Sequence, residues 1–393
     1  MPENEIVILS GARTAIGTFG GSLAALPPIA LATAVTRAAL ERAHVAPDRI
    51  GQVVFGHVIN TEPRDMYLSR VAMLEAGIPH TTPAMNVNRL CGSGAQAVVS
   101  AAQALLLGDA DFAVAGGAES MSRSPYAMSS ARFGAKMGDQ MIQDMMTGAL
   151  TCPMGTGHMG VTAENVAAEH GITREQQDEF AMESQRRAAA AIAAGHFRDQ
   201  IVPIEVKTRK GLVAFDTDEH PKETSVEKLA GLKPVFQKGG SVTAGNASGI
   251  NDGAAALVLA RAQAAEAAGL APRARIRGYA VAGVRPEVMG IGPIPAVEAL
   301  LARTGLKADQ FDVIESNEAF AAQALAVNKG LGLDPARVNP NGGAIALGHP
   351  VGATGAILTV KALHELERTG GRLGLITMCI GGGQGIAIAI ERL

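Results

Sequence analysis

Two cysteines and one histidine of this chain are surrounded by small residues that leave space for a reacting substrate. Cys91 directly precedes a Gly-Ser-Gly run, three glycines begin two residues after Cys379, and His349 lies between glycine and proline. Glycines beside a thiol leave room for a bulky acyl group and leave backbone N–H groups free to bind an oxyanion. Two thiols and an imidazole in such positions indicate acyl chemistry carried out by thiols.

The position of Cys91 predicts an activated thiol. An amphipathic helix is expected over residues 94–107, so Cys91 lies at its N-terminus, where the helix dipole favours the thiolate. A free thiol with a pKa of about 8.5 is only a few per cent ionised at pH 7, so a nucleophilic cysteine needs such help. We therefore expect a lowered pKa for Cys91. Cys152 has no comparable context, and we interpret it as a small buried hydrophobic residue.

Cys379 and His349 lie in segments of other kinds. Residues 373–377 and 386–390 are expected to be strands, so Cys379 ends a strand and the glycines after it predict a tight turn. His349 lies in a stretch without helical or strand periodicity, shortly before an expected helix that begins at Gly355. Neither segment carries the glycine motif of a phosphate or dinucleotide site.

Asn317 allows two interpretations. It follows an expected strand at residues 313–315, and a polar residue at the carboxyl end of a strand is typical of active sites in α/β proteins. It also precedes an expected helix at residues 319–330, so that it can equally be an ordinary helix N-cap.

Composition and charge narrow the class of protein. A length of 393 residues predicts two or three domains, and 47% hydrophobic with 18% charged residues is typical of a globular protein with a large core. A net charge of −3 and the absence of tryptophan give no support for a nucleic-acid or membrane partner. No apolar stretch is expected to be long enough to span a bilayer. Three cysteines, without a CxxC pair or a secretory signal, favour free thiols in the cytoplasm.

Other catalytic classes are disfavoured by spacing. The cysteines and histidines lack the spacing of metal ligands and no HExxH motif occurs, so we expect no metal. Ser248 stands in the wrong place for the G-x-S-x-G turn of a serine hydrolase.

Short apolar runs alternate with alanine-rich amphipathic stretches, which predicts an α/β protein built from β-α-β units. Three pairs of segments share an offset of 261 residues: 48–56 with 309–317, the helix starts Gly94 and Gly355, and the strand ends Ala118 and Cys379. Such a repeat predicts two similar halves with a site between them. Further expected strands cover 6–9, 53–55, 112–115 and 276–281, and further expected helices cover 29–43, 296–303 and 355–367.

The segment from residue 120 to about 243 has no counterpart in the second half. It is helical in pattern from 162 to 195, with Thr173 as the expected N-cap of a helix and Gln176 in the capping-box position. A long insertion in a compact fold usually serves function or assembly, so we interpret this stretch as an inserted loop domain.

Taken together, these segments resemble the thiolase family, the acetyl-CoA C-acyltransferases, and within it the bacterial biosynthetic β-ketothiolases. The resemblance implies a duplicated α/β fold of two β-α-β-α-β halves, each with a mixed five-stranded sheet, in αβαβα layers. It assigns residues 1–119 and 249–271 to the N-terminal half, 120–248 to the inserted loop domain and 272–393 to the C-terminal half. The matching segments span nearly the whole chain in order: 88–94, 116–122, 158–165, 243–252, 317–321, the His349 loop and 379–383.

The resemblance implies a role for each catalytic candidate. Cys91 would be the nucleophile that takes the acyl group, His349 would accept its proton, and Cys379 would be the acid/base at the α-carbon of the second acyl-CoA. His349 and a water held by Asn317 would form one oxyanion hole, and the N–H groups of Cys91 and Gly381 the other. Each such donor is typically worth a few kcal/mol, about 3.

It also implies a binding site for coenzyme A (CoA) and the acyl chain. Lys222 stands where biosynthetic thiolases often carry an arginine near the CoA adenine, and as a point charge it lacks the arginine fork. The adaptable Met145 and Met146, close to Leu150, are expected to widen the acyl pocket. The full set of implied contacts is Ser248, Ala244, Ala247, His158, Met159, Lys222, Met289, Phe320 and Leu150.

The expected activity is the reversible Claisen condensation of two acyl-CoA molecules, with CoA and acyl-CoA as partners and no cofactor. The resemblance further implies a homotetramer to which residues 122–147 contribute. Two alternatives remain open: a ketosynthase-like condensing enzyme, which uses one cysteine, and an inactive acyl-CoA-binding protein on the same fold.

Overall fold

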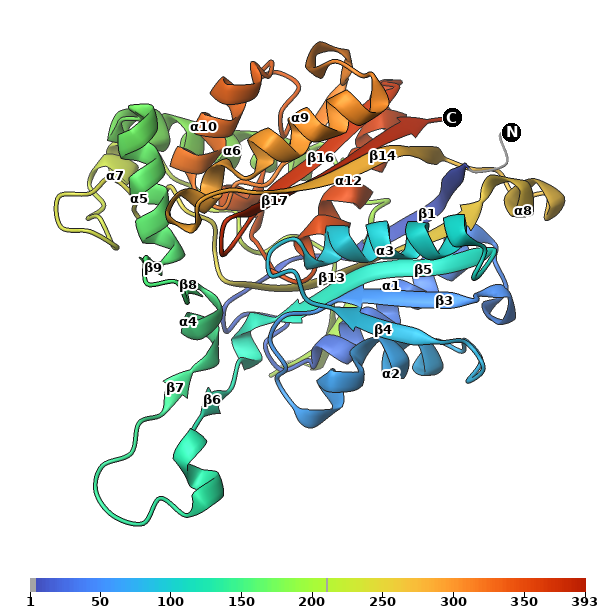
Figure 1. The fold of residues 1–393 in the computed structure, drawn as a ribbon, viewed down its shortest axis with the longest axis horizontal. Coiled ribbons are helices and arrows are strands. Elements are labelled where there is room, and N and C mark those ends of the chain that lie inside the picture. Colours follow the sequence, from blue (N-terminus) through green and yellow to red (C-terminus); the bar gives the residue numbers. More distant parts are fainter. Residues whose placement is uncertain (1–4, 210) are drawn as a thin grey trace.

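The computed structural model describes residues 5–209 and 211–393, and in both halves strands alternate with helices (Figure 1). The N-terminal half contains β1 (Ile6–Thr14), α1 (Pro28–Ala43), β3 (Gln52–Gly56), α2 (Leu68–Glu75), β4 (Ala84–Val87), α3 (Ser93–Leu107), β5 (Phe112–Ser120) and β13 (Asn251–Arg261). The C-terminal half contains β14 (Ala274–Gly283), α9 (Pro293–Thr304), β15 (Val313–Ser316), α10 (Ala321–Leu331), α11 (Ala344–Leu347), α12 (Thr354–Thr369), β16 (Leu373–Ile380) and β17 (Gln384–Arg392).

The predicted repeat is confirmed by the elements themselves. β3 begins at residue 52 and β15 begins 261 residues later, at residue 313. In the same way, α3 begins at residue 93 and α12 at residue 354. β16 repeats β5 in the same way, at 373 against 112. In the C-terminal half the place of a fifth strand is taken by an isolated parallel bridge between Ile314 and Val338.

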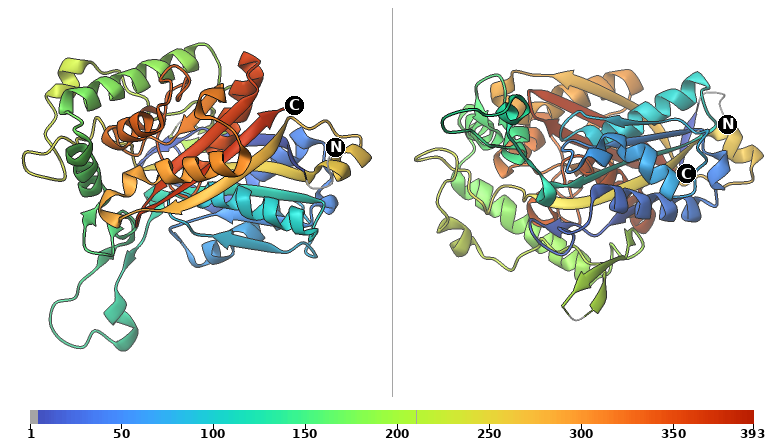
Figure 2. Two further views of the ribbon diagram at one scale, coloured as in Figure 1. Left: turned by 45° about the horizontal axis from the view of Figure 1, so that its top comes forward. Right: turned by 90° about the horizontal axis from the view of Figure 1, so that it is seen from below.

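The strands run in the order β15-β16-β17-β14-β1-β13-β5-β3-β4. β1 pairs with β13 along most of its length, whereas its pairing with β14 is limited to Val7 with Arg275 and Ile8 with Ala274. The sheets of the two halves therefore meet at one end of β1 and separate beyond it, which leaves room for helices between them (Figure 2).

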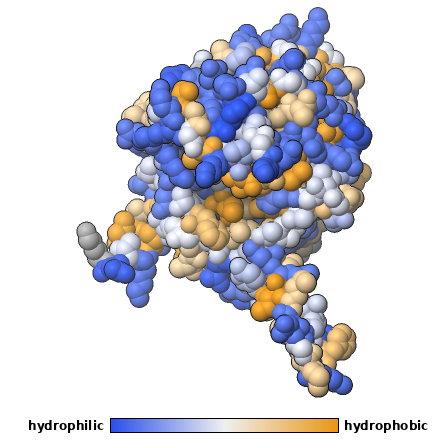
Figure 3. All heavy atoms as spheres, turned by 90° about the vertical axis from the view of Figure 1, so that its left-hand side faces the viewer, coloured by the Kyte–Doolittle hydropathy of each residue, from blue (hydrophilic) through white to orange (hydrophobic). Residues whose placement is uncertain are grey.

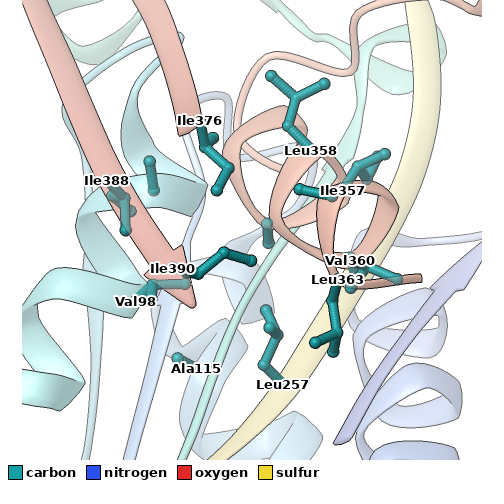
Figure 4. Packing of buried hydrophobic residues seen from close by; sticks show 14 of the residues in the cluster. Val98, Ala115, Leu257, Ile357, Leu358, Val360, Leu363, Ile376, Ile388 and Ile390 are labelled. Atoms are coloured by element: carbon teal, nitrogen blue, oxygen red, sulfur yellow. The ribbon is translucent and has the colours of Figure 1, made fainter. Parts of the chain in front are cut away.

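Helices α3 and α12 fill that central layer. Alternate residues of β1 face different layers, because Ile6 and Ile8 pack with α3 and α12 while Val7 and Leu9 pack with α1 and α2 on the outer face. On the other side, α9 covers the outer face of β14 and β17. The branched side chains of the central cluster interdigitate around α12, as Figure 4 shows for Leu257, Ile376, Ile388 and others. The predicted layered α/β fold is thus confirmed.

The two central helices touch at their N-termini through glycines. A Cβ on Gly355 would lie 2.2 Å from the backbone nitrogen of Ala95, and a Cβ on Gly94 would lie 2.7 Å from the backbone nitrogen of Ala356. No other residue allows this approach, which brings the loops before the two helices to a common place. Those loops carry Cys91 and His349.

Between β5 and β13 the chain leaves the first sheet and forms the inserted stretch. Part of it projects from the body as a long arm (Figures 1 and 3) that contains the paired strands β6 (Tyr126–Ala127) and β7 (Gln143–Asp144). The rest packs on both halves: its helices contact the C-terminal half, whereas Ile201 and Val202 pair with β1, and Ile204 and Val206 pack in the outer cluster of the N-terminal half. It comprises α4 (Met145–Ala149), β8 (Thr151–Cys152), β9 (Gly157–His158), α5 (Met159–His170), α6 (Arg174–Ala193), β10 (Ile201–Val202), β11 (Ile204–Thr208), β12 (Gly211–Phe215) and α7 (Val226–Ala230).

Several local expectations are corrected by the structure. The helical pattern over 162–195 forms two helices, because Gly171 adopts a left-handed φ of 64° and ends α5; the Thr173 capping box that starts α6 is confirmed. The stretch before His349 contains one helical turn, α11. The segment Leu90–Leu107 is long and apolar enough to span a bilayer by length and composition, contrary to expectation. Its helix α3 packs between the two sheets, which explains its hydropathy.

Candidate active site

A cavity of about 510 Å³ opens where the loops before α3 and α12 meet the end of β16. It brings together residues from all parts of the chain, including nearly all of the predicted site. The predicted residues on its wall are Cys91, Leu150, His158, Met159, Lys222, Ala244, Ala247, Ser248, Met289, Phe320, His349 and Cys379.

Asn317 and Gly381 lie at the edge of this cavity. The Nδ2 of Asn317 is 3.4 Å from Nε2 of His349, and Gly381 shares with Cys91 the wall of a small adjoining void of about 10 Å³. The helix N-cap interpretation of Asn317 is wrong, because α10 has Phe320 at its N-cap and no side-chain capping bond.

The loop before α3 is held in a tight turn that presents Cys91. Leu90 adopts a left-handed φ of 46°. The hydroxyl of Ser93 donates to the carbonyl of Leu90 (2.6 Å) and accepts the N–H of Arg89 (2.9 Å). Cys91 is thereby left partly buried and directly before α3.

The hydrogen bonds of His349 determine which ring nitrogen carries the proton. Its Nδ1 lies 2.6 Å from Oγ1 of Thr354, and that hydroxyl donates its single proton to the carbonyl of Pro350 (2.9 Å). Oγ1 of Thr354 therefore accepts from Nδ1–H of His349. The neutral ring then has its lone pair on Nε2. This atom lies 3.4 Å from Nδ2 of Asn317 and can accept a proton.

The backbone of His349 is anchored as firmly as its ring. Its N–H donates to Oδ1 of Asn251 (2.9 Å), and Nδ2 of Asn251 donates to the carbonyl of Gly17 (3.0 Å). Burial lowers the pKa of His349 to about 4, because the charged imidazolium would lose its hydration. His349 is therefore a neutral base at physiological pH.

This low pKa predicts the pH dependence of the first half-reaction. Proton acceptance needs neutral His349, and the ring becomes charged only as the pH falls through its folded value near 4. The single-turnover rate of acyl transfer to Cys91 should therefore show no inflection at the ordinary histidine value of about 6.5. Rapid-quench measurements between about pH 5 and 8, where an ordinary histidine titrates, would check this. An inflection near 6.5 would contradict it.

Both thiols have raised pKa values, and for Cys91 this differs from the expectation. Burial raises the pKa of Cys91; the N–H groups of Gly381 and of Cys91 itself lower that pKa, and the carboxylate of Glu119 raises it. The prediction of a lowered pKa at the helix N-terminus is wrong, because loss of hydration outweighs the dipole. Burial, and then the nearby Cys91, also raise the pKa of Cys379. Both thiols thus start the reaction protonated and need a partner to take the proton.

The end of β16 and the turn after it take the predicted form. Cys379 is fully buried and pairs in register with Gly385 on β17. Gly382 and Gly383 adopt left-handed φ values of 83° and 87°, which glycine favours, and so they close the tight turn. This turn brings the N–H of Gly381 next to the sulfur of Cys91.

The predicted CoA segment is joined to the segment that follows Asn317. The N–H of Ser248 donates to the carbonyl of Ala319 (3.0 Å), and Ala247 forms a bridge with Phe320. His158 caps α5 by accepting the N–H of Gly160 with its Nδ1 (3.1 Å). The first two contacts join the end of the insertion to the C-terminal half at the cavity wall.

Some cavity residues were missed by sequence reasoning. Phe236 stacks on His158 with ring centroids 4.7 Å apart, and its edge meets Phe320 at 6.2 Å. His220 also lines the cavity, where burial and then the charge of Lys222 lower its pKa to about 4. Neither residue has a spacing in the sequence that links it to its neighbours. The methionines on the wall are Met121, Met159 and Met289, instead of the expected Met145 and Met146.

Comparisons with known proteins agree with this geometry. The family model described as "Thiolase, N-terminal domain" matches residues 6–263, and "Thiolase, C-terminal domain" matches residues 270–392. The chain is 61% identical over 391 residues to "Beta-ketothiolase BktB" of Cupriavidus necator, covering 99% of each chain. It is 52% identical over 390 residues to "Acetyl-CoA acetyltransferase" of Escherichia coli, covering 98% of this chain and 99% of the relative.

Solved structures show the same fold. The crystal structure of the Bacillus anthracis acetyl-CoA acetyltransferase matches with a TM-score of 0.97 at 47% identity, covering 100% of this chain and 99% of that one. Human mitochondrial 3-ketoacyl-CoA thiolase in complex with CoA matches with a TM-score of 0.96 at 43% identity, covering 99% and 98%.

Proposed function

This chain belongs to the thiolase family, and we propose that it condenses two acyl-CoA molecules reversibly to a 3-oxoacyl-CoA and CoA, through an acyl group carried on Cys91. It is an acyltransferase. The observation that carries the proposal is the meeting of two protonated thiols with a neutral histidine whose Nε2 holds the lone pair that can accept a proton.

In the first half-reaction, Cys91 gives its proton to Nε2 of His349 and its sulfur attacks the thioester carbonyl. The N–H groups of Cys91 and Gly381 stabilise the oxyanion that forms. When the tetrahedral intermediate breaks down, the C–S bond to CoA is cleaved and the departing thiolate takes the proton of Cys379. The raised pKa of Cys379 suits it to hold this proton until then.

In the second half-reaction, the thiolate of Cys379 removes an α-proton from the second acyl-CoA. The enolate oxygen is stabilised by His349, now protonated, and by a water bound to Asn317, whose buried Oδ1 has no protein partner. The enolate carbon attacks the acyl group on Cys91. Expulsion of the Cys91 thiolate, which recovers its proton from His349, completes the cycle.

The direct test is thiolysis. The purified protein should remove the enolate absorbance of acetoacetyl-CoA only when CoA is added. Persistence of the absorbance under those conditions would reject the proposed reaction. A ketosynthase-like reaction with one cysteine is disfavoured by Cys379 in the same cavity, and a CoA-binding role without catalysis is disfavoured because every implied catalytic group lies there or at its edge.

We propose that the acyl pocket accepts chains longer than acetyl. Three flexible methionines line the cavity with Leu150 and Phe320, so the wall can adapt to a longer chain. The kcat/KM for thiolysis of 3-oxohexanoyl-CoA should lie within about tenfold of that for acetoacetyl-CoA, because flexible methionine side chains can make room for the extra methylenes without a clash. Steady-state kinetics with both substrates would decide, and strict preference for acetoacetyl-CoA would contradict it.

We also propose a cytoplasmic homotetramer that needs no cofactor. The projecting arm exposes Phe133 (83%), Met137 (93%) and Met141 (76%), and an apolar surface of this kind is typical of a surface covered by another subunit. Light scattering should give four times the chain mass, and Phe133→Asp should lower that mass. A monomeric wild-type protein would contradict the assembly.

A further inference from the structure

Glu119 is a fully buried carboxylate beside the active site that the reaction described above does not use. It lies near the end of β5, with none of its surface exposed. Its Oε2 accepts the N–H groups of Val58 (3.1 Å) and Gly352 (2.9 Å), and its Oε1 accepts the N–H of Ile59 (3.1 Å). Nδ1 of His57 lies 3.3 Å from Oε1.

These bonds join the two halves of the molecule at the catalytic loops. Val58 and Ile59 follow β3 of the N-terminal half, whereas Gly352 belongs to the C-terminal half. Gly352 stands between His349 and Thr354, which holds the ring of His349. Its carbonyl is packed against the first half as well, because a Cβ on Gly117 would lie 2.3 Å from it.

The hydrogen-bond partners of Glu119 favour its ionised form, whereas its burial opposes it. Each of the three backbone partners is a donor, so each needs a carboxylate oxygen as its acceptor. Nδ1 of His57 also carries a proton, since it lies 2.9 Å from the carbonyl of Ala118, which can only accept. Burial raises the pKa of Glu119 above its usual value, and His57 and the three N–H groups limit that rise.

We propose that Glu119 is a positioning residue of the thiolase reaction: it ties the turn from His349 to Thr354 to the half that carries Cys91, so that Nε2 of His349 meets the nucleophile. This inference rests on the proposed function. Misplacement of a reacting group by about 1 Å costs about 100-fold in rate, so loss of this tie should affect kcat.

The charge of Glu119 gives the proposal a second readout. The titratable groups facing it are His57, after β3, and Cys91, before α3; Cys379 on β16 faces Cys91 from the other side, and His349 is neutral. Since the Glu119 carboxylate raises the pKa of Cys91, its neutralisation should make the thiol easier to ionise while making turnover slower.

The test uses Glu119→Gln in full-length protein. We expect kcat for acetoacetyl-CoA thiolysis to fall about 10- to 100-fold with the KM for CoA little changed. The pH midpoint for alkylation of Cys91 by iodoacetamide, followed by peptide mass spectrometry, should move to lower pH. Unchanged kcat together with an unchanged midpoint would overturn the proposal.

Two further variants separate positioning from general stability. Glu119→Asp keeps the charge on a shorter side chain, so kcat should fall while the pH midpoint for alkylation of Cys91 stays unchanged. A wild-type kcat in Glu119→Asp would also overturn the proposal. This second variant decides the matter even if Glu119→Gln fails to fold. Glu164→Gln is the matched control, because Glu164 is a buried carboxylate that accepts the N–H groups of Ser241 and Val242 away from Cys91. It should leave the midpoint unchanged. All rates are compared with those of the wild-type protein. If the wild-type protein itself were inactive in thiolysis, that result would reject the proposed function and not the role of Glu119.

Discussion

Replacement of Cys91 by serine is expected to lower the rate of acetoacetyl-CoA thiolysis by at least about 10³-fold, the scale of loss when a nucleophile is removed. A serine hydroxyl is far less acidic than a thiol, and burial already opposes ionisation at this position. His349, with a pKa of about 4, is too weak a base to compensate. The CoA-dependent loss of enolate absorbance measures the effect.

The chain offers a matched control for that variant. Cys152 is also a free buried cysteine, and it packs in an apolar cluster with Met159 and Val242. Cys152→Ala should retain activity within about threefold, since it removes one small buried atom without a place in the reaction. Near-normal activity of Cys91→Ser would remove Cys91 from the mechanism.

Replacement of Cys379 by alanine is expected to separate the two half-reactions. The variant keeps Cys91, His349 and the N–H of Gly381, so acetyl-CoA should still acylate it, although more slowly, because the departing CoA thiolate must take its proton from solvent instead of from Cys379. It lacks the group that moves the α-proton, so condensation and thiolysis should fall by at least about 10²-fold, the lower range for a removed general base. Intact-protein mass spectrometry after mixing with acetyl-CoA should show one added acetyl group.

The location of that acetyl group provides the decisive detail. Peptide mapping should place it on Cys91, and the double variant with Cys91→Ser should acquire none. Absence of an adduct in Cys379→Ala, even after long incubation, would show that acylation cannot proceed without Cys379, which would contradict the division of roles between the two thiols.

Most elements of the fold follow from local patterns that the sequence displays. The helix at Gly94, the strand before Cys379 and the turn after it were each predictable, because apolar periodicity and glycine placement act over short distances. The start of α6 after the turn at Gly171 was also predictable, because Thr173 and Gln176 form a capping box that marks a new helix. The role of Asn317 stayed open because a strand end and a helix start look alike in sequence.

The sequence by itself determined which residues could react: two thiols and one imidazole in local settings of small residues, and one amide at the end of an expected strand. Their meeting depends on long-range packing, in which Gly94 and Gly355 let the two central helices touch. The protonation of the site was decided only by the tertiary structure. A helix dipole can be read from a sequence, but burial depends on what the rest of the chain places over the thiol, and here burial raises the pKa of Cys91. Likewise, the proton on Nδ1 of His349 is set by Thr354 and Pro350, and the tie between the halves by Glu119.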